Sequence, residues 1–153
     1  MEDDLEQAIR EWREAWSAKM RRHSWHPVIF WEAVAERLIV DRRAVELDPR
    51  ICAGSMDGVG SPAFKMLTAR HQKALALEMA KDINSALILY EAGVADCFSS
   101  HSPYDRLRDL YTQRGWYEDA LRVCAAYVAQ PERPGMRNHE YFRRHAAQLL
   151  SFA

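Results

Sequence analysis

The sequence lacks the long hydrophobic run that a membrane-spanning helix needs, since no stretch approaches about 18 consecutive apolar residues. It also lacks the positive and then apolar start of a secretion signal, because it begins with the acidic segment MEDDLEQ. An excess of either charge is missing too: 21 Lys and Arg against 22 Asp and Glu give a net charge of -1. We therefore expect no strongly basic face of the kind that binds nucleic acid.

Cysteine is scarce. The chain has only Cys52, Cys97 and Cys124, an odd number without C-x-x-C spacing, which predicts reduced thiols and a cytoplasmic protein. His23 and His26 form an H-x-x-H pair, but no second close pair accompanies them, and zinc needs three or four converging ligands. We therefore expect no metal and no other cofactor, and we assign the histidine pair to a helix end, where the helix dipole favours positive charge.

Catalytic motifs are missing as well. The chain has no G-x-S-x-G and no H-E-x-x-H, and its glycine-rich stretch SMDGVGSP at 55–62 has no lysine after the glycines. Asp105 and Asp109 lie one helical turn apart and could tune each other's acidity or hold a cation, yet Arg106 and Arg108 can neutralise them. We predict that the protein is not an enzyme, with a small enzyme or metal-binding protein as an alternative.

Helical periodicity is what the sequence does contain. Apolar residues recur at steps of three or four over 3–22, and a second amphipathic helix is indicated over 28–47, after Pro27. Strand-like alternation bounded by turn signals is absent, and the one long loop is DPRICAGSMDGVGSP. The length fits one domain. The sequence thus predicts a single all-α domain with an N-terminal helical hairpin at 1–48, a loop at 49–61, two hairpin repeats at 62–131 and a C-terminal helix at 135–152.

Two segments of the second half share one pattern. AKDINSALILYEAG (80–93) and RGWYEDALRVCAAY (114–127) align with an offset of 34 residues. The corresponding pairs are Ala86 and Ala120, Leu77 and Tyr111, Ile83 and Tyr117, and Leu87 and Leu121. A 34-residue period is the length of one helix–turn–helix unit that stacks on a copy of itself. The small alanines let antiparallel helices approach closely, and Gly115 relieves the turn between them.

This pattern resembles the tetratricopeptide repeat family. The second copy matches the family signature at Tyr104, Leu107, Tyr111, Gly115, Tyr117 and Ala120, with Pro131 close to the terminal proline. The first copy matches at Ala74, Leu77, Ile83, Ala86 and Tyr90. It departs at Lys81, which stands where the turn glycine would be, and Arg108 and Tyr127 are larger than the family prefers. The resemblance covers 67–131 and implies a short right-handed α-solenoid with a C-terminal capping helix; a generic helical bundle is the alternative.

The resemblance also implies a function, because tetratricopeptide arrays bind a peptide or a partner protein on the concave surface formed by the first helix of each repeat. The corresponding groove positions are Thr68, His71, Leu75, Glu78, Asp105, Asp109, Thr112 and Gln113, with His139 and Arg143 from the C-terminal helix. Asp105 and Asp109 stand where chaperone-tail binders of the family carry basic and Asn residues. The resemblance therefore implies a basic or mixed-charge peptide, and neither nucleic acid nor a membrane is an expected partner.

Four of the five tryptophans lie within 20 residues, at Trp12, Trp16, Trp25 and Trp31. One interpretation is a core in which the first two helices pack their aromatic side chains together. The other is an interface, because aromatic residues are favoured there and a repeat array needs its apolar ends covered. A hairpin that covers the array imperfectly would make a homodimer. A self-assembling structural subunit, a homodimer through this Trp-rich hairpin or through the terminal helix, is therefore the alternative to an interaction module.

Overall fold

Helices form nearly all of the regular structure of this protein. A computed structural model describes residues 2–44 and 62–152 of the chain. The seven helices of this described part are α1 (Glu2–Arg21), α2 (Val28–Ala44), α4 (Pro62–Met79), α5 (Ile83–Ala95), α6 (Ser102–Arg114), α7 (Tyr117–Val128) and α8 (His139–Ser151). No strand occurs among these residues. The predicted all-α class is confirmed for the part of the chain that the structure describes.

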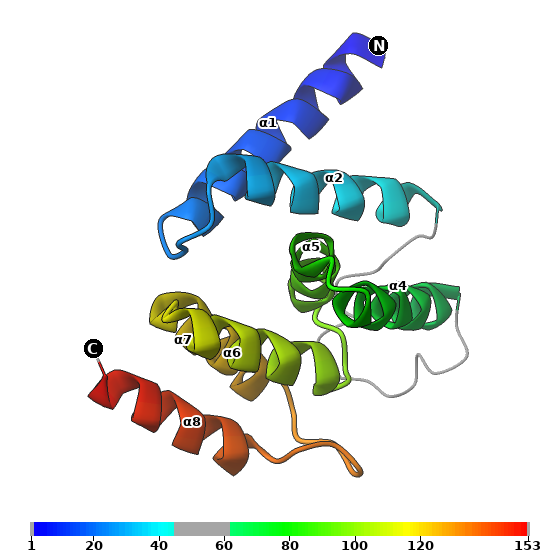
Figure 1. The fold of residues 1–153 in the computed structure, drawn as a ribbon. Helices are drawn as coiled ribbons and strands as arrows, with labels where there is room; N and C mark the ends of the chain where they lie inside the picture. Colours follow the sequence, from blue (N-terminus) through cyan, green and yellow to red (C-terminus); the bar gives the residue numbers. More distant parts are fainter. Residues whose placement is uncertain (1, 45–61, 153) are drawn as a thin grey trace.

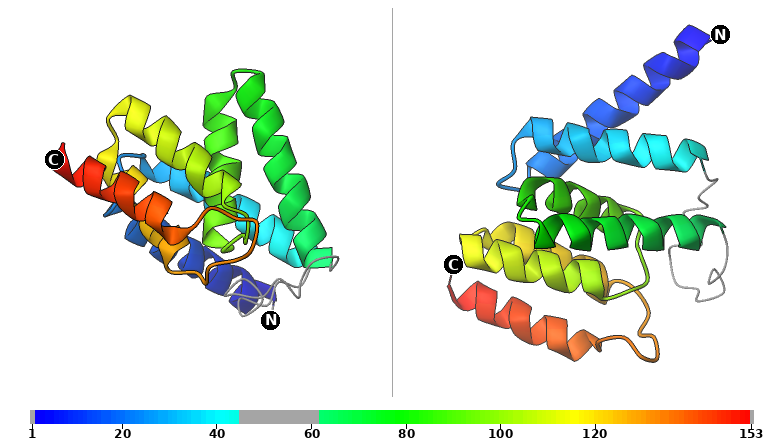
Figure 2. Two further views of the ribbon diagram at one scale, coloured as in Figure 1. Left: turned by 90° about the horizontal axis from the view of Figure 1, so that it is seen from below. Right: turned by 45° about the vertical axis from the view of Figure 1, so that its right-hand side comes forward.

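The helices stack in successive layers that follow the order of the sequence (Figure 1). α1 crosses α2, α2 packs on α5, the α4–α5 hairpin is followed by the α6–α7 hairpin, and α8 packs on α7. Figure 2 shows that the amino-terminal half of α1 projects beyond the other helices. Each layer therefore packs mainly on its neighbours in sequence, and α1 and α8 lie at opposite ends of the stack.

The predicted helix limits are close to the observed ones, with one correction. The helix expected over 135–152 begins only at His139, because Gly135 has a φ of +80° and is not helical. Asn138 precedes the helix, and its side chain accepts a hydrogen bond from the backbone N–H of Tyr141. This cap satisfies a donor at the helix start that has no partner within the helix. The predicted loop at 49–61 and the last three residues, 45–47, of the helix predicted over 28–47 lie outside the described residues.

The turns of the two repeated hairpins have the same backbone geometry, 34 residues apart. Gly115 has a φ of +75° and Lys81 a φ of +68°. The backbone N–H groups of Lys81 and Gly115 donate to the carbonyls of Glu78 and Thr112, three residues before each donor. The N–H groups of the following residues, Asp82 and Trp116, donate to the carbonyls of Leu77 and Tyr111, five residues before each donor. A left-handed residue that satisfies the last carbonyls is a common helix end. The predicted role of Gly115 is confirmed, and Lys81 adopts the same conformation without being a glycine.

Lys81→Gly should raise the free energy of unfolding by about 1 kcal/mol, because the left-handed conformation is unfavourable for a residue with a Cβ. Gly115→Ala should lower it by about 1 kcal/mol for the same reason. A Cβ at Gly115 would meet no atom within 4 Å, so that loss reports backbone conformation alone. Urea unfolding of both variants measures these changes. A destabilised Lys81→Gly variant would contradict the expectation.

The core runs through all layers, and the tryptophans divide between core and surface. Ala86 and Ala120, the small residues of the repeated pattern, are fully buried. Trp31 is also fully buried, with the ring of Trp16 5.8 Å away. Trp25, in contrast, is 63% exposed. The core interpretation therefore holds for one part of the tryptophan cluster, and the other part lies on the surface.

Candidate functional site

The predicted groove positions of α4 lie at its contacts with other helices. The Nε2 atom of His71 is 2.8 Å from the Ser102 hydroxyl at the start of α6, and burial lowers the pKa of the His71 imidazole. The Glu78 carboxylate accepts from the Tyr90 hydroxyl at 2.7 Å and from Nε of Arg106, on α6, at 3.1 Å. Burial alone would raise the pKa of Glu78, but these two hydrogen bonds hold it below its usual value. The other predicted positions of α4, both half-buried, are Thr68 and Leu75.

Asp105 connects α6 to α8. Its carboxylate accepts from Nη2 of Arg108 at 2.9 Å and from the Tyr141 hydroxyl at 3.0 Å, and Arg137 lies 3.3 Å away. Burial would raise the pKa of Asp105, but the hydrogen bonds from Arg108 and Tyr141 lower it below the usual range. Asp105 therefore stabilises the contact between two helices and is not a free acidic group.

Asp109 belongs to a different cluster. It lies 3.2 Å from Arg106, which also binds Glu78, so the structure brings Asp109 and Glu78 together around one guanidinium. The Thr112 hydroxyl donates to the backbone carbonyl of Arg108. The remaining predicted positions are half-buried His139 and exposed Gln113 and Arg143. The three predicted carboxylates, Glu78, Asp105 and Asp109, thus all have arginine partners. The preference for a basic peptide stays a prediction, and none of these carboxylates is free to attract one.

His26 lies in a buried polar cluster that the sequence interpretation missed. It is in the loop between α1 and α2, stacked on Phe30 at a ring separation of 3.5 Å, so the assignment of the His23–His26 pair to a helix end is wrong for this residue. The Tyr111 hydroxyl donates to Glu91 at 3.0 Å, and Nε2 of His26 is 2.9 Å from the same hydroxyl oxygen. Since the hydroxyl has only one hydrogen, His26 must donate from Nε2. Burial lowers the pKa of His26 to about 4, so the imidazole is neutral.

Arg122 completes this cluster. Its guanidinium lies 2.9 Å from Glu91, 3.0 Å from Asp119 and 5.0 Å from the centre of the Trp31 ring. Asp119 also accepts from the backbone N–H of Trp25 at 2.8 Å. Because Glu91 and Asp119 are almost fully buried, no substrate reaches these carboxylates. The cluster ties the N-terminal hairpin to α5, α6 and α7, which is a structural role.

A second buried arginine ties α2 to the first repeated hairpin. Arg70 on α4 donates to Asp41 of α2 and to Asp96, just after α5, both at 2.9 Å. Arg42 of α2 also donates to Asp96, at 2.7 Å. These contacts fix the distance between α2 and the α4–α5 hairpin.

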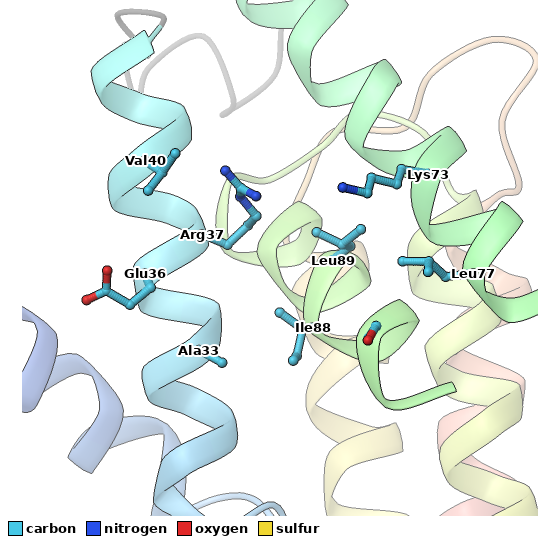
Figure 3. A pocket seen from close by; sticks show the side chains of 9 residues that line it. Ala33, Glu36, Arg37, Val40, Lys73, Leu77, Ile88 and Leu89 are labelled. Atoms are coloured by element: carbon cyan, nitrogen blue, oxygen red, sulfur yellow. The ribbon is translucent and has the colours of Figure 1, made fainter. Parts of the chain in front are cut away.

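An apolar groove opens between α2, α4 and α5 (Figure 3). It has a volume of about 460 Å³, which is within the range of small-ligand sites. The apolar residues that line it are Ala33 and Val40 of α2, Leu77 of α4, and Ile88 and Leu89 of α5. We call this site the α2–α4–α5 groove. It offers apolar side chains on three helices to a ligand of similar character.

The charges inside the α2–α4–α5 groove are positive. Arg37 and Lys73 point into it, whereas Glu36 points away (Figure 3) and pairs with Arg13 of α1. Arg37 has one partner, Asp41, at 2.9 Å. Lys73 is exposed and has no ion pair among the described residues. The groove therefore combines apolar walls with an available cation.

A second apolar depression lies between α1, α5 and α7. Its apolar lining consists of Met20, Val94, Leu121, Ala125 and Ala126. Its lining also contains Arg122, which pairs with Glu91 and Asp119, and two residues of opposite charge, Lys19 and Glu118. It therefore offers no preference for a ligand of one charge.

A comparison of the chain with protein-family models, curated proteins and solved structures found no significant match. None of the described helices has the length and apolar character that a membrane crossing requires. Within residues 2–44 and 62–152, no group of three or more His, Cys, Asp or Glu side chains is placed to hold a metal ion. A functional proposal therefore depends on the geometry of the described surface, above all on the α2–α4–α5 groove.

Proposed function

We propose that the protein is a non-enzymatic interaction module that binds an amphipathic helix of a partner protein in the α2–α4–α5 groove. The observation that carries the proposal is the combination, in one open groove, of apolar walls and Lys73, which has no ion pair among the described residues. An amphipathic helix binds such a groove through its apolar face. Acidic residues beside that face would complement Lys73 and Arg37.

The predicted concave surface is a weaker candidate on chemical grounds. Glu78, Asp105 and Asp109 are paired with arginines of the same chain, and a ligand would have to replace those pairs. Exchange of one ion pair for another yields little net free energy at a partly exposed site. The α2–α4–α5 groove requires no such exchange at Lys73.

We also propose that the hairpins form a tetratricopeptide-like array and act in the cytoplasm. The matching turns at Lys81 and Gly115 and the buried Ala86 and Ala120 support equivalence of the two hairpins. Cys97 and Cys124 are free thiols, which fits a reducing compartment. An array of this kind would use the N-terminal hairpin to form one wall of its binding groove.

Two synthetic helical peptides with the same apolar face, one flanked by glutamates and one by lysines, test the binding mode. Titrated into isotope-labelled full-length protein, the acidic peptide should shift the amide resonances of Lys73, Ile88 and Leu89. The basic peptide should bind more weakly, because it meets Arg37 and Lys73. Binding of the acidic peptide should weaken as salt rises, since these charges are partly exposed.

Lys73→Glu should weaken binding of the acidic peptide by about tenfold, because it reverses one partly exposed charge in the groove. Lys65→Glu is the matched control, since Lys65 is an exposed lysine of the same helix outside the groove lining. Shifts confined to the α4, α6 and α8 positions of the predicted concave surface would contradict the proposal. So would equal binding of the acidic and basic peptides.

A further inference from the structure

The amino-terminal half of α1 carries an apolar stripe that the described residues cover only in part. Leu5 is 62% exposed and Trp12 is 38% exposed, with Ile9 half-buried between them. Trp12 still contacts the body of the protein, because it stacks on Trp16 and lies 5.6 Å from the guanidinium of Arg42. The amino-terminal part of α1 diverges from α2 (Figures 1 and 2). The stripe therefore continues past the last helix against which it packs.

This stripe does not fill the α2–α4–α5 groove of its own chain. In Figure 3, α2 lies between α1 and the groove, and Glu36 on the far side of α2 pairs with Arg13 of α1. Figure 2 shows that the free end of α1 points away from α4 and α5. An apolar stripe that the described residues leave partly exposed and an open apolar groove are thus present in one molecule but separated by a helix.

The charges of the stripe and the groove are complementary. The first turns of α1 contain the acidic residues Asp4 and Glu6. The lining of the groove contains Arg37, which pairs with Asp41, and Lys73, and the acidic residue of that lining, Glu36, is turned toward α1. Charge therefore supports the groove of a second copy as the binding site of the stripe.

We infer that two copies of the chain exchange their α1 helices, so that Leu5, Ile9 and Trp12 of each copy pack into the α2–α4–α5 groove of the other. This inference rests on the proposed function and names a second copy as the occupant of the groove. Reciprocal exchange closes a two-fold dimer and buries two helix–groove contacts, whereas one such contact alone would make a small interface. The outward face of α8 is polar at Glu140, Arg143 and Arg144, and its large exposed apolar side chains, Leu150 and Phe152, are confined to its carboxyl end.

Light scattering coupled to size-exclusion chromatography of the full chain tests the exchange. At high micromolar concentration the wild-type mass should be twice the 17.7 kDa of one chain. The α1 variant Leu5→Lys/Ile9→Lys and the groove variant Val40→Glu/Lys73→Glu should each have the mass of one chain. Ala125→Glu, an exposed substitution in the depression between α1 and α7, should leave the dimer intact.

The single substitution Leu5→Lys, at an exposed position, should also give the mass of one chain. Circular dichroism checks that every variant keeps its helices. A monomeric wild type at high micromolar concentration overturns the inference. A groove variant that stays dimeric while the α1 variant is monomeric also overturns it, because α1 then binds elsewhere. These results can be separated from the test of the proposed function. If the acidic peptide binds a monomeric wild type, the inference of α1 exchange is wrong and the proposed function stands. If neither peptide binds the monomeric α1 variant, the proposal that the groove is a binding site is wrong.

Discussion

Arg122→Met should lower the free energy of unfolding by about 3–5 kcal/mol, the range found when one partner of a buried ion pair is removed. Arg122 lies 2.9 Å from Glu91 and 3.0 Å from Asp119, and both carboxylates are almost fully buried. Without the guanidinium, two carboxylates would share a buried site with no positive charge beside them. Chemical denaturation followed by circular dichroism measures the loss.

Arg42→Met is the matched control for this prediction. Arg42 also pairs with a buried carboxylate, Asp96, but its own side chain is 37% exposed, and Asp96 keeps Arg70 at 2.9 Å. We therefore expect Arg42→Met to lower the free energy of unfolding by less than about 1 kcal/mol. Equal losses in the two variants would mean that the Arg122 cluster does not hold the N-terminal hairpin in place.

Acidification should destabilise the protein through His26. Burial lowers the pKa of this imidazole from 6.5 to about 4 in the folded protein, so the unfolded chain binds the proton more readily. The stabilising effect is therefore complete above pH 6.5, falls as the pH drops, and levels off below about pH 4. Between pH 7.5 and pH 5 the free energy of unfolding should fall by about 2 kcal/mol from this residue.

His26→Gln isolates this contribution, because the amide still offers an N–H to the Tyr111 oxygen but does not titrate. The pKa values of His71, His101 and His145 are also lowered, in each case first by burial, so all three add to the acid sensitivity of both proteins. The relevant quantity is the difference in pH dependence between wild type and variant. An identical dependence in both would show that His26 does not lose stability on protonation.

The helices were predictable because their signals are local. Apolar spacing located α1 and α2 to within a few residues, and Gly115 marked the turn of the second hairpin. Lys81 shows the limit of this logic: its left-handed conformation follows from the hairpin around it and not from its own preference. The start of α8 was missed by four residues, although Asn138 is a recognisable cap.

The pairing of charges was predictable only within single helices. Asp105 and Arg108, like Asp119 and Arg122, are three residues apart, a spacing that brings side chains together on a helix. No spacing rule relates Glu78 to Arg106, 28 residues further on. The α2–α4–α5 groove was missed for the same reason.

The groove depends on how far α2 lies from the α4–α5 hairpin. That distance is set by Arg70 together with Asp41 and Asp96, residues that are far apart in the sequence. Helical periodicity identifies the apolar faces of α2, α4 and α5 but contains no information about the separation of the helices. The sequence therefore indicated apolar faces without showing that three of them leave an opening between them.

The arginines at the contacts between layers also make those layers non-interchangeable. Arg70 joins α4 to α2, Arg106 joins α6 to α4, and Arg122 joins α7 to α5. Although the two hairpins share their turns and their small residues, each carries its cation at a different position. A copy of one hairpin placed in the next layer would bury a guanidinium against the wrong neighbour. An extra hairpin in this stack would therefore need its own set of charged partners.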